Sequence, residues 1–343
     1  MGGAIIQQGE LISPEQLLSS CPLHILTKRM VLDSRKRLEK IFKGEDDKKV
    51  LIIGPCSADF EDSLIEYASF IKGISEEVKD RIEIIMRFYT GKPRSELGWK
   101  GLVNSAPGED PDINKGILQS RQLAIKILEL GVPIADEILN PNLTLHFQDL
   151  LSYAAIGARS SANQNHREVA SGLEFPIGIK NPTSGKVMPM TQSIKSAQGS
   201  HEYFILNRIL KSSGNDVAHG ILRGGESGPN FSIKNIQEYI DLSASKKLKN
   251  PGLIIDCNHD NSGKNPDNQI LIMQEVLNNI VPSLSTPSVI KGFMVESYIF
   301  DGNQKEESGK SIQRGLSLTD PCIGKEKTMQ FIYSLYDIIG KSK

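Results

Sequence analysis

The sequence predicts a (β/α)8 barrel preceded by an N-terminal extension. Eight short apolar runs alternate with segments of helical spacing, and continuous apolar runs are typical of parallel strands that are buried on both faces. Each run also ends in a polar residue, and barrels of this kind place their chemistry at the carboxyl ends of their strands. A doubly wound open sheet is the alternative, which we favour less because the glycine-rich dinucleotide fingerprint is missing.

The predicted strands share an aliphatic run and a chemically capable residue at or near its end. In chain order they are VLIIGPCS (ending at Cys56 and Ser57), IEIIMRFY (Arg87), VPIADEIL (Asp136 and Glu137), AAIGARS (Arg159), FPIGIKNP (Lys180), VAHGILRGG (Arg223), LIIDCNH (Cys257 and His259) and VIKGFMVES (Glu296 and Ser297). Eight strand ends that all carry such residues indicate an enzyme.

Segments of helical spacing precede, separate and follow these runs. We predict helices at Val31–Phe42, Glu61–Lys79, Asn114–Leu130, Leu143–Leu150, Gln164–Gly172, Thr191–Ala197, Ile233–Ala244, Asn268–Val281 and Lys325–Ile339. Residues 183–216 are long for one crossover, so a short hairpin is expected around His201–Leu206. The polar stretch Asp301–Ser317 predicts a mobile loop near the last strand.

We expect two parts in the chain. Residues 1–45 form an N-terminal extension whose spare apolar residues suit a subunit contact, and residues 46–343 form the catalytic barrel. The net charge of −1 argues against nucleic acid or an anionic membrane as a partner. Four cysteines are too few for a disulfide framework, and no secretory segment opens the sequence, so we expect a cytoplasmic protein.

Cys56, His259, Glu296 and Asp320 are candidate metal ligands. The first three end strands, Asp320 follows the last strand, and the strand ends of a barrel meet at one mouth. This mixture of sulfur, nitrogen and oxygen suits Mn²⁺, Fe²⁺, Co²⁺ or Zn²⁺. The spacing itself is unspecific. The alternative is a buried Cys56 that packs as a small apolar residue and a structural His259.

Six cationic side chains at or just after strand ends indicate an anionic ligand, with more than one phosphate. Arginine binds carboxylate and phosphate through two parallel hydrogen bonds, whereas lysine acts as a point charge. The alternative is surface charge paired with carboxylates, which is hardest to sustain for cations that interrupt buried strands. The six are Arg87, Lys92, Arg94, Arg159, Lys180 and Arg223.

Two further features leave alternatives open. Glu137 suits a general base or a group that orients water, and equally a structural partner for an arginine. Gly224 and Gly225 follow Arg223 and would let backbone N–H groups approach a phosphate, although a lone Gly-Gly pair is weak evidence.

Eight segments, in order along almost the whole chain, resemble the class I 3-deoxy-D-arabino-heptulosonate 7-phosphate (DAHP) synthases. They are GPCSAD, MRFYTGKPRSELGWKG, IGARSSANQNHRE, GIKNPTSG, HGILRGG, DCNHDNSGK, MVESYIFDGNQ and LTDPCIG. The resemblance implies condensation of phosphoenolpyruvate with erythrose 4-phosphate in the shikimate pathway, a divalent metal, a (β/α)8 barrel with an N-terminal extension, and a homodimer or homotetramer.

The resemblance also implies roles for individual residues. The metal ligands fall on Cys56, His259, Glu296 and Asp320. The donor site falls on Arg87, Glu137, Gly157, Ala158, Arg159, Lys180 and Arg223, and the erythrose phosphate motif on Lys92-Pro93-Arg94-Ser95. Lys180, Lys92 and Glu137 are the expected catalytic residues. Either Lys180 or a metal-bound water is the expected proton donor, and Glu137 is expected to orient the attacking water.

Three positions depart from the family pattern. Ser95 stands where threonine is usual, Glu96 places a negative charge beside a phosphate site, and Lys325 replaces a tryptophan. Because the metal and donor positions are unchanged, the departures concern the acceptor. Two alternatives follow: a related synthase that uses another aldose phosphate, or a non-catalytic regulatory paralogue.

Overall fold

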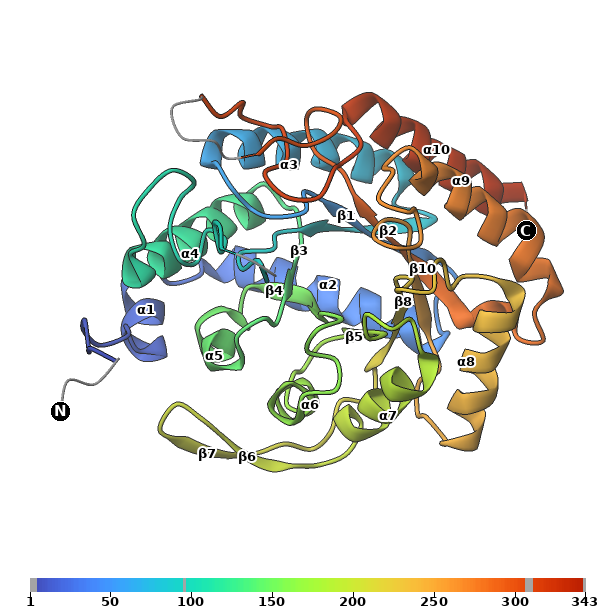
Figure 1. Cartoon of the computed structure of the whole chain (residues 1–343), viewed down its shortest axis with the longest axis horizontal. Coiled ribbons are helices and arrows are strands. Elements are labelled where there is room, and N and C mark those ends of the chain that lie inside the picture. The colour runs from blue at the N-terminus through green and yellow to red at the C-terminus, as the bar shows by residue number, and fades with distance from the viewer. Residues whose placement is uncertain (1–4, 95–96, 306–310, 342–343) are drawn as a thin grey trace.

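Eight parallel strands close into a barrel that is surrounded by helices (Figure 1). This computed structural model describes residues 5–94, 97–305 and 311–341. Around the barrel the strands run in the order β1-β10-β9-β8-β5-β4-β3-β2, and β1 pairs with both β2 and β10. Closure through these pairs confirms the predicted barrel and excludes the open sheet.

Each barrel strand overlaps one of the predicted apolar runs, although β1 begins one residue and β4 three residues before its run. They are β1 (Lys49–Gly54), β2 (Ile82–Arg87), β3 (Ile134–Glu137), β4 (Leu151–Ile156), β5 (Ile177–Lys180), β8 (His219–Leu222), β9 (Leu253–Asp256) and β10 (Ile290–Glu296). β6 (Glu202–Ile205) and β7 (Arg208–Lys211) form a separate antiparallel pair, which confirms the predicted hairpin.

Apart from α1, which the sequence did not predict, the α-helices of the described ranges follow the predicted order, with differences at their ends. They are α1 (Pro14–Ser20), α2 (Ile25–Lys43), α3 (Glu61–Val78), α4 (Ile113–Glu129), α5 (Thr144–Phe147), α6 (Gln164–Ser171), α7 (Val187–Ala197), α8 (Ile233–Ser245), α9 (Asn268–Glu275) and α10 (Lys325–Lys341). α7 begins before its predicted start because Pro189 lies in its first turn, where a missing N–H breaks no helical hydrogen bond. α9 is shorter than predicted because the chain continues as a π-helical turn at Val276–Ile280.

Two hydrophobic cores position the strands. One lies between the barrel and its helices. The other fills the barrel interior and includes Leu38, Ile41 and Phe42 from the end of α2. Phe42 stacks on His219, the first residue of β8, with ring centroids 3.8 Å apart. α2 therefore closes the amino-terminal end of the barrel. No helix in the described ranges has the length and apolar character that crossing a membrane requires.

Candidate active site

A cavity of about 560 Å³ opens at the carboxyl ends of the barrel strands. It gathers most of the residues that the sequence singled out, although they come from widely separated parts of the chain. Those that line it are Arg87, Lys92, Arg94, Glu137, Gly157, Ala158, Arg159, Lys180, Arg223, His259, Glu296 and Asp320. The strand ends therefore converge as the barrel prediction required.

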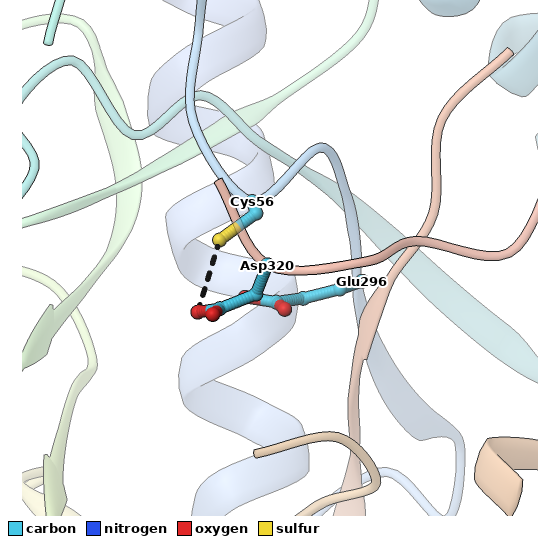
Figure 2. A group of neighbouring side chains, drawn as sticks. All are labelled: Cys56, Glu296 and Asp320. Atoms are coloured by element: carbon cyan, nitrogen blue, oxygen red, sulfur yellow. Dashed lines mark hydrogen bonds between the residues drawn. The ribbon is translucent and has the colours of Figure 1, made fainter. Parts of the chain in front are cut away.

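Cys56, Glu296 and Asp320 form a cluster at this cavity, which Glu296 and Asp320 line and beside which Cys56 is fully buried. Cys56 lies just beyond β1, Glu296 ends β10, and Asp320 lies in the loop before α10. One ligand atom from each of the three lies within 4.8 Å of the other two, and Figure 2 shows the three side chains turned toward one another. The Cys56 Sγ is 3.5 Å from Asp320 Oδ2. A thiol and two carboxylates at this spacing fit a divalent transition metal.

His259, the fourth predicted ligand, lies in the loop after β9 and is not part of the group whose ligand atoms lie within 4.8 Å of one another. Its Nε2 lies 3.6 Å from Glu296 Oε1, and its Nδ1 lies 2.9 Å from Asp256 Oδ2. A carboxylate beside Nδ1 favours the proton on that nitrogen, which leaves a lone pair on Nε2 facing Glu296. His259 also has a φ of 52°, a left-handed backbone that turns its ring back toward the strand end. The donor chemistry of the four residues therefore fits a metal ion.

The Lys92 side chain contacts two members of this cluster, Cys56 and Asp320. Its Nζ donates to Cys56 Sγ at 2.6 Å and lies 3.5 Å from Asp320 Oδ2. Burial, together with Glu296, raises the pKa of the Cys56 thiol to about 12 against the opposing effect of Lys92. A cysteine must be a thiolate to bind a metal, so metal binding here releases a proton and weakens as the pH falls.

Glu296 is held from three sides. Arg87 Nη2 donates to its Oε1 at 2.9 Å, and Asn258 donates to its other oxygen. The Gln269 side chain bonds both the N–H and the C=O of Glu296, at 2.9 Å each. Within the described ranges, Arg87 Nη1 is buried without a hydrogen-bond partner, although Arg87 lines the cavity. An unpaired buried guanidinium nitrogen suits an anionic ligand.

Arg223 follows β8, the neighbour of β9, and donates from Nη1 to the carboxylate of Asp260, the residue after His259. The glycine pair after Arg223 does not form a phosphate cradle. The N–H of Gly224 donates to Asn230 Oδ1 at 2.7 Å, and that of Gly225 donates to the Gly228 carbonyl at 3.0 Å. This corrects the suggestion that these N–H groups approach a phosphate. Gly225 is needed instead for close packing, because a Cβ there would lie 2.2 Å from the backbone nitrogen of Gly185.

The remaining donor positions lie at the ends of β3 and β4. A Cβ on Gly157 would lie 2.3 Å from Glu137 Oε1, so only glycine allows the Glu137 carboxylate to occupy its place in the cavity. Ala158 and Arg159 follow Gly157 and line the same cavity. Glu137 therefore faces the space that a ligand would fill.

Known proteins that are similar to this chain identify its family. A sequence profile of the DAHP synthetase I family matches residues 24–332. The chain belongs to this family. It is 36% identical over 345 residues to the Tyr-sensitive phospho-2-dehydro-3-deoxyheptonate aldolase of Escherichia coli strain K12, covering 98% of this chain and 96% of that protein.

Two further relatives in the DAHP synthetase I family cover nearly the whole chain. The Phe-sensitive aldolase of Escherichia coli strain K12 is 37% identical, covering 96% of this chain and 95% of that protein. A solved phospho-2-dehydro-3-deoxyheptonate aldolase from Francisella tularensis SCHU S4 superposes with a TM-score of 0.93 at 35% identity, covering 98% of each chain.

Of the three departures from the family pattern, the structure describes one, Lys325. Ser95 and Glu96 lie outside the described residues. Lys325 begins α10, where it pairs with Glu66 and lies over the Phe70 ring, and it is not among the residues that line the cavity. Within the described part of the motif, Arg94 lines the cavity. The change at Lys325 therefore does not alter the cavity wall.

The sequence analysis did not identify the residues that fix His259, Lys180 and Glu296 in position. Asp256 ends β9, and its buried side chain faces both His259 and Lys180. Asn258 and Gln269 fix Glu296. Asp256 was detectable, because an acidic residue at the end of a predicted barrel strand fits the same rule that selected Glu296. Gln269 gave no such signal, since it lies on a helix.

Proposed function

We propose that this protein is a DAHP synthase that condenses phosphoenolpyruvate with erythrose 4-phosphate and releases inorganic phosphate. The supporting observation is that an imidazole, two carboxylates and cations suited to two phosphorylated substrates line one cavity, and that a buried thiol lies beside the two carboxylates. Relatives that cover almost the whole chain carry the aldolase name. C3 of the donor attacks the aldehyde carbon, water adds at C2, and phosphate leaves with cleavage of the C–O bond.

The residues divide this work between them. Arg159, Lys180 and Arg223 hold the anionic donor and offset the charge that develops on it. Lys180 supplies a proton, and Glu137 orients the attacking water. A divalent metal bound by Cys56, His259, Glu296 and Asp320 would supply Lewis-acid polarisation of the acceptor's aldehyde oxygen. Arg94, with Lys92, holds the distal phosphate of the acceptor.

A mass-spectrometric product assay tests this proposal. The chelated and metal-reconstituted protein is incubated with phosphoenolpyruvate and a panel of aldose phosphates. We expect DAHP and phosphate only with metal, and the highest kcat/KM with erythrose 4-phosphate. A clear preference for ribose 5-phosphate or arabinose 5-phosphate would indicate the related synthase. Absence of any product with every metal would indicate the non-catalytic paralogue.

We also propose that the protein assembles as a homodimer or homotetramer through its amino-terminal arm and the β6–β7 hairpin. Figure 1 shows α1 and the hairpin on the same side of the barrel, and Arg208 of the hairpin pairs with Glu15 of α1. Phe204 and Ile209 are 76% and 80% exposed there. Sedimentation equilibrium of a Phe204→Asp, Ile209→Asp variant should give a smaller assembly than the unaltered protein, and an unchanged mass would place the contact elsewhere.

A further inference from the structure

Asp256 occupies an unusual position between two parts of the site. Its side chain is fully buried at the end of β9. Its Oδ2 lies 2.9 Å from His259 Nδ1 and 3.3 Å from Lys180 Nζ. Its Oδ1 accepts the backbone N–H of Asn258 at 3.0 Å and is also hydrogen-bonded to His259 Nδ1 at 3.1 Å. One carboxylate therefore contacts a proposed metal ligand and a proposed catalytic lysine at the same time.

We propose that Asp256 is a positioning residue that serves both halves of the reaction. It fixes the orientation and tautomer of His259 for the metal, and it holds the ammonium of Lys180 in place for the donor. The inference rests on the proposed function for the roles of His259 and Lys180.

The charges explain why a carboxylate is needed here. Lys180 is 4% exposed, and Asp256 is the only acidic side chain within salt-bridge distance of it among the described residues. A buried ammonium without a partner is costly. A metal-bound histidine in turn usually donates its other N–H to a carboxylate, which fixes the ring and increases its basicity. Asp256 meets both requirements with one carboxylate, since its Oδ1 is bonded to His259 and its Oδ2 faces Lys180.

An Asp256→Asn substitution replaces one acceptor oxygen of the carboxylate with an N–H donor and removes the negative charge. The Asn258 N–H already donates to the Oδ1 position, so the amide oxygen of the new side chain takes that place. The amide NH₂ then occupies the Oδ2 position, where it faces the Lys180 ammonium and His259 Nδ1. At the Oδ1 position His259 Nδ1 keeps only a neutral amide oxygen as acceptor. His259 therefore loses the carboxylate that fixes its ring and increases its basicity toward the metal.

Metal affinity gives a readout that does not depend on catalysis. Titration of the chelated protein with Co²⁺, followed by the sulfur-to-cobalt absorption of Cys56, should show roughly 10- to 100-fold weaker binding for Asp256→Asn. The loss should also be non-additive: Asp256→Asn combined with His259→Gln should bind Co²⁺ no more weakly than His259→Gln alone. Asp149→Asn is the matched control, because it removes the partner of the buried Arg121 outside the cavity.

The turnover number kcat reports on the contact between Asp256 and Lys180. With Co²⁺ saturating, Asp256→Asn should lower kcat by about 100-fold, since a displacement of about 1 Å in a reacting group costs on this order. The KM for phosphoenolpyruvate should change less than kcat, because Arg159 and Arg223 still hold the donor. A purely structural role would lower the Tm of Asp256→Asn and leave the Co²⁺ affinity of its folded fraction unchanged.

The outcomes separate the two proposals. Unaltered Co²⁺ affinity and unaltered kcat in Asp256→Asn, with an active unaltered protein, would overturn the role of Asp256. An unaltered protein that forms no product would overturn the proposed function, while the Co²⁺ titration would still decide the contact to His259. If Asp256→Asn does not fold, the same measurements on Asp256→Ser decide, since serine also lacks the carboxylate.

Discussion

The two ends of the barrel interior differ in how they treat polar groups. At the carboxyl end, buried charges are paired: Arg87 with Glu296 at 2.9 Å, and Lys180 with Asp256 at 3.3 Å. At the amino end the polar group is neutral. Burial lowers the pKa of His219 to about 3. The His219 ring stacks on Phe42 and is hydrogen-bonded to the Tyr153 hydroxyl.

The difference shows where the fold accommodates charge. A buried ion pair stabilises a fold only weakly, because desolvation offsets much of the attraction. Charges at the carboxyl end are therefore explained by ligand binding, whereas the neutral contacts of Phe42 and His219 are explained by packing. We expect substitutions at the carboxyl end to change metal and substrate binding most, and substitutions at the amino end to change stability.

The largest effect is expected at the metal cluster. Cys56→Ala removes the only thiol in the group of possible ligands within the described residues, so bound metal and kcat should both fall by at least about 100-fold, more than for loss of a supporting residue. Elemental analysis and the product assay measure the two. Cys257→Ala is the control, since Cys257 is a buried thiol of the core between barrel and helices. A loss of metal in the control alone would mean that Cys257 supplies the thiolate.

A smaller effect is expected at Arg223, which lines the same cavity. Arg223→Ala should weaken phosphoenolpyruvate binding by roughly 30- to 1000-fold, because a lost arginine contact to an anion in a desolvated site costs about 2–4 kcal/mol. Bound metal should not change, since Arg223 contacts Asp260 and none of the proposed ligands. Calorimetry measures the affinity, and an unchanged dissociation constant would make Arg223 structural.

A gain of affinity is expected at the partner of Arg223. Asp260 competes with a phosphate for the guanidinium, so Asp260→Asn should bind phosphoenolpyruvate and inorganic phosphate more tightly. The gain should be at most about fivefold, because partly exposed ion pairs contribute about 0.2–1 kcal/mol. Competitive inhibition by inorganic phosphate measures it. Weaker inhibition in this variant would mean that Asp260 orients Arg223 for the phosphate.

The smallest effect on turnover is expected at the amino end. The unfolded chain protonates His219 below about pH 6.5, whereas the folded chain does so only near pH 3, so stability falls as the pH decreases through 6.5. Between pH 6.5 and 5 this amounts to about 2 kcal/mol. His219→Gln should lose that part of the acid sensitivity in urea unfolding and keep kcat at pH 7. An equal acid sensitivity in both proteins would contradict a neutral buried His219.

The sequence was sufficient for the barrel and for most of the cavity wall. The apolar runs predicted every barrel strand, because strands buried on both faces have a composition that is readable without their neighbours. Arg87, Lys180 and Glu296 were selected because barrel enzymes carry their chemistry at the carboxyl ends of their strands, and these ends can be located from the local sequence. Where the sequence failed, the missing information was spatial: the N–H groups of Gly224 and Gly225 are already bonded, which only the folds of their loops reveal.

By itself the sequence determined the fold class, the order of the strands along the chain and the residue types at their carboxyl ends, since these follow from periodicity and from strand burial. Only the tertiary structure decided which of these residues meet. Lys92 contacts the Cys56 thiol, Asp256 joins His259 to Lys180, and α2 closes the barrel behind them. These contacts join residues from different strands and loops, and closure of the barrel brings them within hydrogen-bonding distance.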